Sequence, residues 1–224
     1  MSRAAARGNL DELSHDLAFS LRHVYFFCIP MAVGVIFFWE PMLRILCLGG
    51  NYTRDDLMAA QMVAIFYGAG IPAFCSVKVL LAPFYARKMM STTLRYSLIA
   101  IGCNIVLNLI LMWPLQQGGI ALATVLASML NNGLLLRHLR REGIPFGGRE
   151  VAAAAARSLG IAVAAGLALY WVYPLIRSRL TFRHVGEFPA FALLGTLFTL
   201  LYLAGSRLLR ARELSELTGV IRRR

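Results

Sequence analysis

Two apolar runs long enough to cross a membrane lie close together near the middle of the chain, at residues 96–113 and 118–136. An α-helix needs roughly 20 apolar residues to cross the hydrocarbon core of a bilayer. Only residues 114–117 separate the two runs, so two consecutive helices here must be antiparallel neighbours. The pattern predicts a hairpin of membrane helices and argues against a fold built around one water-soluble core.

Further apolar runs fill most of the remaining sequence. Of the 224 residues, 58% are hydrophobic and 15% are charged, whereas soluble domains carry about 25% charged residues. Leu10, Leu13, Leu17 and Leu21 have the spacing of an amphipathic helix that leads into the first run. We therefore expect an all-α, polytopic membrane helix bundle with six transmembrane helices and an N-terminal amphipathic segment. The expected helices cover residues 10–48, 55–87, 94–113, 118–141, 150–178 and 188–213.

The basic residues indicate how these helices are oriented. The net charge is +12, but the Lys and Arg residues fall between the apolar runs, so we expect no nucleic-acid partner. Six helices place both termini on one side of the membrane, and most of the 23 Lys and Arg residues lie on that side. The positive-inside rule then predicts a multi-pass inner-membrane protein with both termini in the cytoplasm. The arginines expected on the opposite side are Arg44, Arg54, Arg177, Arg179 and Arg183.

Lys78 lies inside the second apolar run. A lysine at the centre of a bilayer costs on the order of 2.5–3.5 kcal/mol. The side chain could face a water-filled interior, or it could snorkel toward the membrane surface near Ala86. Ala86 lies eight residues after Lys78, and eight residues of helix rise by about 12 Å. This distance is a long reach for a snorkelling side chain. Both placements remain open from the sequence.

Polar side chains at helical spacing follow the two helices of the predicted hairpin. Asn104 and Asn108 share one face of the first helix, and Thr124, Ser128 and Asn132 share one face of the second. Because the helices are neighbours, we expect the two stripes to meet. They could form hydrogen bonds between the helices, worth about 0.6 kcal/mol each. They could instead supply the oxygen ligands of a cation, although neither helix carries a carboxylate.

The arrangement of titratable residues argues against an enzyme. Catalysis at a membrane face would need a nucleophile with a base, a pair of carboxylates or clustered metal ligands. The four histidines are instead scattered over different helix ends and loops, at His15, His23, His138 and His184. Transport, lipid handling or membrane assembly are the functions that remain.

Several segments of residues 2–141 resemble the MurJ/MviN family of lipid II flippases. They are VKVLLAPFYAR at residues 77–87, NIVLNL at residues 104–109 and GGIALAT at residues 118–124. The opening SRAAARGNLDEL is similar to the family's segment that leads into its ninth membrane helix. The last two apolar runs match only by position and character.

The resemblance implies a transporter of the multidrug/oligosaccharidyl-lipid/polysaccharide exporter superfamily. Such a protein moves lipid II, the undecaprenyl-pyrophosphate-linked peptidoglycan precursor, from the inner to the outer leaflet of the cytoplasmic membrane. Residues 1–141 would form part of the carboxy-terminal lobe, and residues 142–224 the terminal helix pair with a basic cytoplasmic tail. Lipid II, membrane lipids and a missing amino-terminal half of the transporter would be its partners, and the chain would be incomplete alone.

The resemblance also implies site residues. Lys78 and Arg87 match the family's stretch at residues 77–87 and would line the transport cavity. The cavity would also include the two polar stripes, namely Asn104, Asn108, Thr124, Ser128 and Asn132. In members with a sodium site, the matching ligands are Asn104, Asn108, Thr124 and the carbonyl of Ile120. We expect no cofactor other than sodium or the membrane potential as a driving force.

Residues 151–203 match helices of the family that form an apolar groove for the polyprenyl tail.

Two other functions stay open from the sequence. The chain could belong to an exporter of the same superfamily with a polysaccharide-lipid or drug cargo. It could also be a membrane scaffold that transports nothing.

Overall fold

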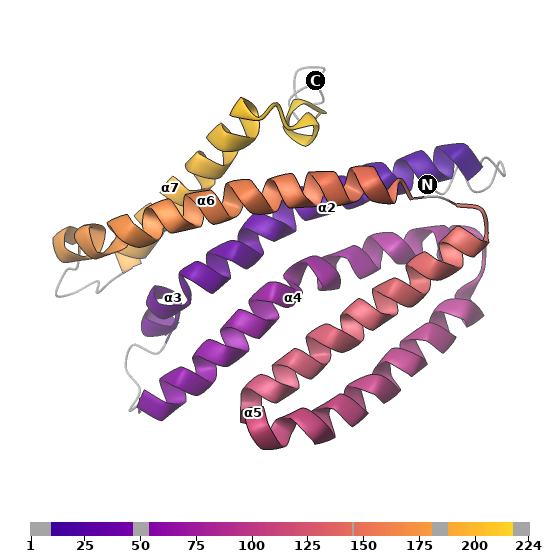
Figure 1. The fold of residues 1–224 in the computed structure, drawn as a ribbon, viewed down its shortest axis with the longest axis horizontal. Coiled ribbons are helices and arrows are strands. Elements are labelled where there is room, and N and C mark those ends of the chain that lie inside the picture. The colour runs from indigo at the N-terminus through magenta and orange to yellow at the C-terminus, as the bar shows by residue number, and fades with distance from the viewer. Residues whose placement is uncertain (1–9, 47–53, 145, 181–187, 217–224) are drawn as a thin grey trace.

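A computed structural model describes residues 10–46, 54–144, 146–180 and 188–216 of the chain. Within these ranges the ordered elements are helices, and no strand occurs. Figure 1 shows their arrangement. The helices are α2 (Leu10–Phe37), α3 (Trp39–Leu46), α4 (Arg54–Ala86), α5 (Met90–Arg141), α6 (Gly148–Leu180) and α7 (Phe188–Leu208).

Five of these helices are long and apolar enough to cross a membrane: α2, α4, α5, α6 and α7. The helix α5 contains 52 residues, and its backbone at Gln116 is not helical, with φ 49° and ψ −125°. Figure 1 shows that α5 folds back on itself at this point. Residues 90–115 therefore form a first limb and residues 117–141 a second limb. With two limbs in α5, the predicted all-α bundle of six membrane crossings is confirmed.

The hairpin in α5 depends on a proline and a glycine. Pro114 has no N–H to continue the first limb. Gly119 lies against the main chain of the first limb, where a Cβ atom would overlap the carbonyl oxygen of Leu111. The two limbs can approach this closely only because position 119 carries no side chain.

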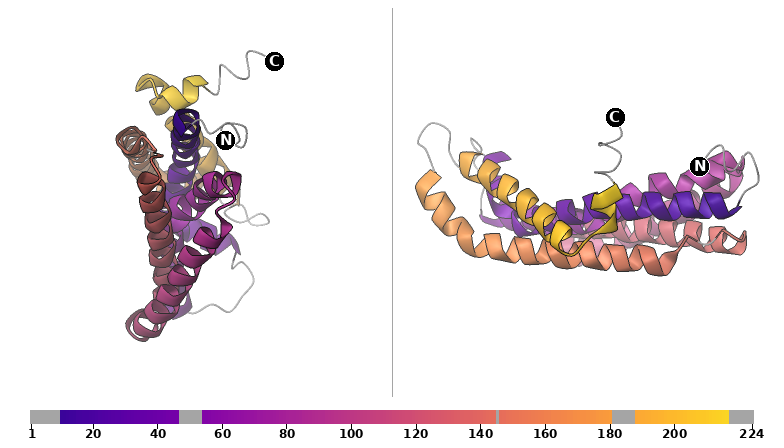
Figure 2. Two further views of the ribbon diagram at one scale, coloured as in Figure 1. Left: turned by 90° about the vertical axis from the view of Figure 1, so that its right-hand side faces the viewer. Right: turned by 90° about the horizontal axis from the view of Figure 1, so that it is seen from above.

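The helices pack in an order that differs from their order along the chain. The helix α2 contacts both α4 and α6, while α4 contacts α5 and α6 contacts α7. The second limb of α5 lies between α4 and the first limb (Figure 1). Figure 2 shows in its right-hand view that the helices run along the long axis of the molecule. The first limb is therefore an edge helix, and it exposes large apolar side chains at Leu94, Leu98, Ile101, Ile105 and Leu109.

Two apolar clusters hold the bundle together. One joins α2 to α6 and α7, through Phe26 of α2, Ala162 of α6 and Leu194 of α7. The other joins the start of α2 to the ends of α4 and α5, through Leu17, Phe84 and Leu135.

The predicted amphipathic stripe faces the bundle. Leu13, Leu17 and Leu21 are at most 2% exposed, whereas Leu10 at the first position of α2 is exposed. The stripe belongs to α2 itself, which continues without a break from Leu10 to Phe37. The segment expected to precede the first membrane helix is therefore the first part of that helix.

Two predicted helix boundaries differ from the structure. The helix expected at residues 10–48 is divided into α2 and α3, because Pro41 cannot donate a hydrogen bond back to the last residue of α2. Residues 47 and 48 lie outside the described ranges. The helix expected at residues 188–213 ends at Leu208, and a separate short helix covers residues 212–216. The basic tail at residues 217–224 is also outside the described part.

The end of α7 follows a motif that also ends α4 and α5. Each helix is followed by a residue with positive φ, namely Lys88 at 58°, Gly143 at 73° and Arg210 at 48°. The next N–H then bonds to a carbonyl five residues earlier, a pattern that satisfies the free carbonyls of a helix end. These bonds are Met89 N to Phe84 O at 2.8 Å, Ile144 N to Leu139 O at 3.0 Å and Ala211 N to Ser206 O at 2.8 Å.

Candidate functional site

The best-connected polar residue inside the bundle is Asn132 on the second limb of α5. Its side chain is buried, and its Nδ2 donates to the carbonyl oxygen of Ala73 at 2.9 Å and to Ser76 Oγ at 3.0 Å. Both acceptors belong to α4. Ser76 is fully buried and donates its own hydroxyl to Ala73 O at 3.0 Å. Asn132 therefore joins the second limb to α4.

The hydrogen bonds of the two polar stripes of α5 run along each limb, and in the described residues none joins Asn104 or Asn108 to Thr124 or Ser128. Asn108 Nδ2 donates to Asn104 Oδ1 at 3.0 Å, within the first limb. Thr124 Oγ1 donates to the carbonyl oxygen of Ile120 at 2.9 Å, within the second limb. Each short polar side chain bonds along its own helix, as Thr and Asn commonly do. The side-chain hydrogen bond that does join the limbs lies at their ends, between Tyr96 and His138.

The sodium site predicted from the resemblance stays a prediction. Its oxygen atoms come from Asn104, Asn108, Thr124 and Ile120, and their hydrogen bonds run within each limb. Asn108 Oδ1 is buried without a hydrogen-bond partner, so one oxygen acceptor of the set remains available. In the described ranges there is no group of His, Cys, Asp and Glu that could hold a metal ion.

Lys78 is exposed on α4, although Ser76 and Leu80 beside it are buried. In the described part of the chain it has no ion-pair partner. Its side chain is therefore exposed on a face that the other described residues do not cover. The two sequence-based predictions for Lys78 both stay open: its side chain faces a water-filled cavity, or it snorkels to the membrane surface.

Arg87 belongs to a polar network at the end of the bundle where α4 stops. Its Nη2 lies 3.1 Å from Glu142 Oε2. His138 Nε2 lies 3.9 Å from Glu142 Oε1, and His138 Nδ1 is 3.1 Å from the hydroxyl of Tyr96. The network ties the end of α4 to both ends of α5. Sequence analysis identified Arg87 but missed Glu142, because the whole of α5 separates the two residues along the chain.

An apolar groove lies between α2 and α7, with a volume of about 610 Å³. Its walls come from both helices, namely Phe27, Met31 and Val35 of α2 and Phe191 and Leu203 of α7. Two hydroxyl groups in the walls both donate to backbone carbonyls: Tyr202 to Phe26 O at 2.8 Å and Thr199 to Gly195 O at 2.8 Å. The groove therefore offers an almost purely apolar surface. Sequence analysis expected such a groove from the terminal pair, and the structure forms it from one helix of that pair, α7, together with α2.

The short helix at residues 212–216 packs against the middle of α2 and the first half of α6. Glu216 lies 3.7 Å from Arg22 and 3.5 Å from His23, both on α2. Glu213 is buried and lies 4.0 Å from Arg157 of α6. These acidic residues hold the segment after α7 against α2 and α6. The sequence shows acidic residues at these positions but not which helices they reach.

Comparison with known proteins gives consistent matches. The family model described as "Lipid II flippase MurJ" matches residues 1–185. The chain is 34% identical over 144 residues to a probable lipid II flippase MurJ of Vibrio cholerae, covering 64% of this chain and 27% of that protein. It is 28% identical over 165 residues to the corresponding protein of Haemophilus influenzae, covering 74% and 32%. The chain thus spans about a third or less of the length of these relatives.

A solved structure shares the fold. It is described as lipid II flippase MurJ in an inward closed conformation, and it matches with a TM-score of 0.69 at 23% sequence identity. The match covers 93% of this chain and 41% of the solved chain. The helix arrangement described above is therefore that of part of a larger helical membrane protein.

Proposed function

This chain belongs to the MurJ family, and from that premise we propose that it is the carboxy-terminal part of a lipid II flippase. Its substrate would be the undecaprenyl-pyrophosphate-linked peptidoglycan precursor, moved from the inner to the outer leaflet of the cytoplasmic membrane. The family match and the apolar helices support a multi-pass protein of the inner membrane. The relatives are named as flippases, which agrees with a function in transport.

The observation that carries this proposal is the apolar groove between α2 and α7. A lipid-linked substrate needs an apolar surface for its tail while its polar head crosses the membrane. The groove supplies such a surface, because its two hydroxyls are already bonded to the backbone. Ligand sites of several hundred Å³ are typical of proteins that bind small molecules, and the groove measures about 610 Å³.

Transport by alternating access requires two lobes that move against each other around a central site. We propose that an amino-terminal half completes the transporter and covers the exposed face that carries Lys78. In that arrangement Lys78, Arg87, Asn104, Asn108, Thr124 and Ser128 would border the substrate cavity, whereas Asn132 is buried against α4. If sodium drives the cycle, Asn104, Asn108, Thr124 and the Ile120 carbonyl are the groups that would hold it. The membrane potential is the alternative driving force.

Filling the groove tests the proposal. Gly195 lines the groove, and a Cβ atom placed there meets nothing within 4 Å. Gly195→Leu should therefore insert a side chain into the groove without disturbing the packing. The assay is growth of cells depleted of their own flippase, which carry this chain joined to the amino-terminal half of a MurJ relative. We expect Gly195→Leu to abolish growth at a normal protein level.

A matched control separates groove filling from a general effect of leucine. Gly160 of α6 is also free of neighbours within 4 Å and does not line the groove. Gly160→Leu should support growth like the parent chain. Normal growth with Gly195→Leu would contradict the role of the groove. Growth supported by this chain without an amino-terminal half would contradict the proposal that it is incomplete alone.

A further inference from the structure

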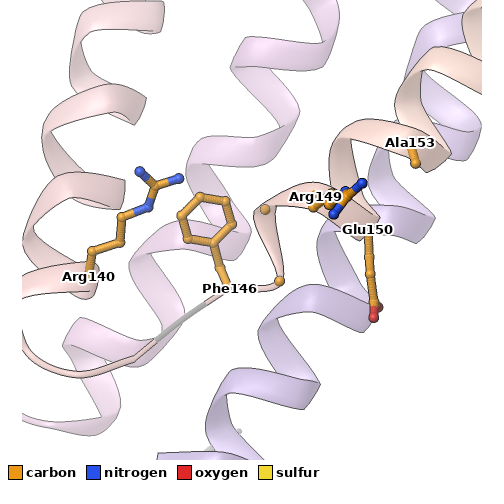
Figure 3. A pocket seen from close by; sticks show the side chains of 7 residues that line it. Arg140, Phe146, Arg149, Glu150 and Ala153 are labelled. Carbon is orange, nitrogen blue, oxygen red and sulfur yellow. The ribbon is translucent and has the colours of Figure 1, made fainter.

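Two adjoining cavities lie where α5 ends and α6 begins, outside the site described above. Their volumes are about 690 Å³ and 510 Å³, and they share Arg140 and Phe146 in their walls. Arg149 lines the first cavity, and Arg137 and Arg141 line the second. Figure 3 shows the first cavity, with Arg140 and Arg149 on either side of the Phe146 ring. Four arginines thus surround one continuous hollow at the end of the bundle.

The charge of these four arginines is not neutralised within the described part of the chain. None of the four has an ion-pair partner there. The acidic residue in the cavity walls is Glu150, and Figure 3 shows its carboxylate directed away from Arg140. The hollow therefore attracts anions. Glu142, the acidic residue just after α5, is already paired with Arg87.

The guanidinium of Arg140 is held in place before any ligand binds. Its Cζ lies 4.7 Å from the centre of the Phe146 ring, and Phe146 itself is buried. Such stacking uses the flat face of a guanidinium and leaves its N–H edge free to donate. The guanidinium also lies near α6: Arg140 Nη2 is 3.4 Å from the position that a Cβ atom of Gly148 would occupy. Glycine at position 148 therefore lets the guanidinium lie close to the first turn of α6.

The position of the hollow in the membrane decides between a lipid and a soluble anion. It lies between α5, which ends at Arg141, and α6, which begins at Gly148. Both helices are long and apolar enough to cross a membrane, so we expect their link at the level of the phospholipid headgroups. The second cavity continues from Arg137 onto Gly133 and Leu136, one turn into the apolar part of α5. A ligand that fills it thus has an anionic head with an apolar part attached. Basic pockets between membrane helices commonly bind anionic lipid headgroups.

We propose that Arg137, Arg140, Arg141 and Arg149 bind the phosphate of an anionic phospholipid headgroup. This site is separate from the apolar groove between α2 and α7 and does not depend on the proposed transport. The guanidinium groups would donate paired hydrogen bonds to phosphate oxygens, for which their planar geometry is suited. The acyl chains would lie along the surface near Leu136.

Native mass spectrometry of the full chain in a neutral detergent tests the proposal. The probes are phosphatidylglycerol, which is anionic, and phosphatidylcholine of the same acyl chains, which is zwitterionic. We expect the parent chain to retain phosphatidylglycerol in preference to phosphatidylcholine. The double variant Arg140→Gln with Arg149→Gln should retain on the order of tenfold less phosphatidylglycerol, because each basic residue at a membrane surface contributes severalfold to binding.

The control removes the same charge from the same end of the bundle. Lys88 and Arg95 are exposed and line neither cavity. The variant Lys88→Gln with Arg95→Gln should keep the preference for phosphatidylglycerol. An equal loss in this control would overturn the proposal, since net charge alone would then explain the binding. An absent preference in the parent chain would overturn it as well.

A competitor and a second variant complete the experiment. Inorganic phosphate is added as a competitor, and displacement of the lipid at equal concentrations would assign the site to a soluble anion and overturn the lipid assignment. If the Arg140 and Arg149 variant does not fold, as judged by its circular dichroism, Arg137→Gln with Arg141→Gln replaces it. Loss of the preference in this second variant supports the proposal, and its retention contradicts it.

Discussion

Asn132 shows how one amide can set the packing of a membrane helix. Its Nδ2 reaches two acceptors on α4, Ala73 O and Ser76 Oγ, in a buried part of the bundle. Removing the amide leaves buried acceptors without this donor, which costs free energy. The stability of the contact between α4 and the second limb should therefore depend on this side chain.

We predict that Asn132→Ala lowers the free energy of unfolding by about 1 kcal/mol, within the range of hydrogen bonds between membrane helices. The measurement is unfolding in mixed micelles by titration with a denaturing detergent. Thr196→Val removes an exposed hydroxyl that bonds only within α7, and it should change stability little. A double-mutant cycle with Ser76→Ala should show coupling, and independent effects of the two substitutions would contradict the contact.

Lys78 allows transport to be separated from a purely structural role. Because it is exposed and unpaired in the described ranges, Lys78→Met removes a charge and no contact of this chain. We predict normal insertion and stability but loss of growth in the depletion assay, with the amino-terminal half present. Unchanged growth would favour a scaffold, or a lysine that only snorkels. Protein level in the membrane fraction is measured in the same cells.

The hairpin of α5 was predictable because proline and glycine interrupt an otherwise apolar run. The short segment 114–117 required antiparallel neighbours whatever their side chains. The partner of each helix face was not predictable. Thr124, Ser128 and Asn132 follow one another at the same spacing of four residues, on a helix whose apolar residues lie on all sides. Which of them meets another helix depends on the crossing of α4, which the local sequence does not contain.

A substitution at Gly119 tests whether the two limbs of the hairpin approach each other closely there. We predict that Gly119→Ala destabilises the chain, because its Cβ would overlap the carbonyl oxygen of Leu111. In contrast, Gly102→Ala in the first limb meets nothing within 4 Å. This control should be neutral or more stable by about 0.5–1 kcal/mol, the usual difference between Gly and Ala in a helix. Thermal unfolding of both variants in detergent is the measurement, and equal stability would contradict the close crossing.

The network around Arg87 shows a different limit of sequence analysis. Arg87 and Glu142 each lie just beyond a helix end, where charged residues are common and usually contact only water. Their separation of 3.1 Å exists because α4 and the second limb of α5 finish at the same end of the bundle. The apolar runs predicted that shared end, since they predicted the direction of every helix. They could not predict which of several nearby bases would meet Glu142.

The two ends of the bundle are formed by different segments of the chain. The start of α2, the turn after α4 and the link between α5 and α6 lie together there, while α3 and the bend in α5 lie at the opposite end (Figure 1). The ion pair of Arg87 with Glu142 lies at the first end, and the pair of Arg44 with Glu40 lies on α3 at the opposite end. The pairs of Arg22 and Arg157 lie further along α2 and α6. Basic residues gather beside the turn after α4 and the link between α5 and α6, and by the positive-inside rule we propose that this end faces the cytoplasm.

Reporter fusions test that orientation. Alkaline phosphatase is active only outside the cytoplasm, so a fusion after Arg224 should be inactive and a fusion after Arg183, between α6 and α7, should be active. A fluorescent protein that folds only in the cytoplasm should give the reverse pattern at the same positions. An active phosphatase after Arg224 would show that the bundle is inverted. The arginine hollow at the junction of α5 and α6 would then face the outer leaflet, and its lipid partner would have to be sought there.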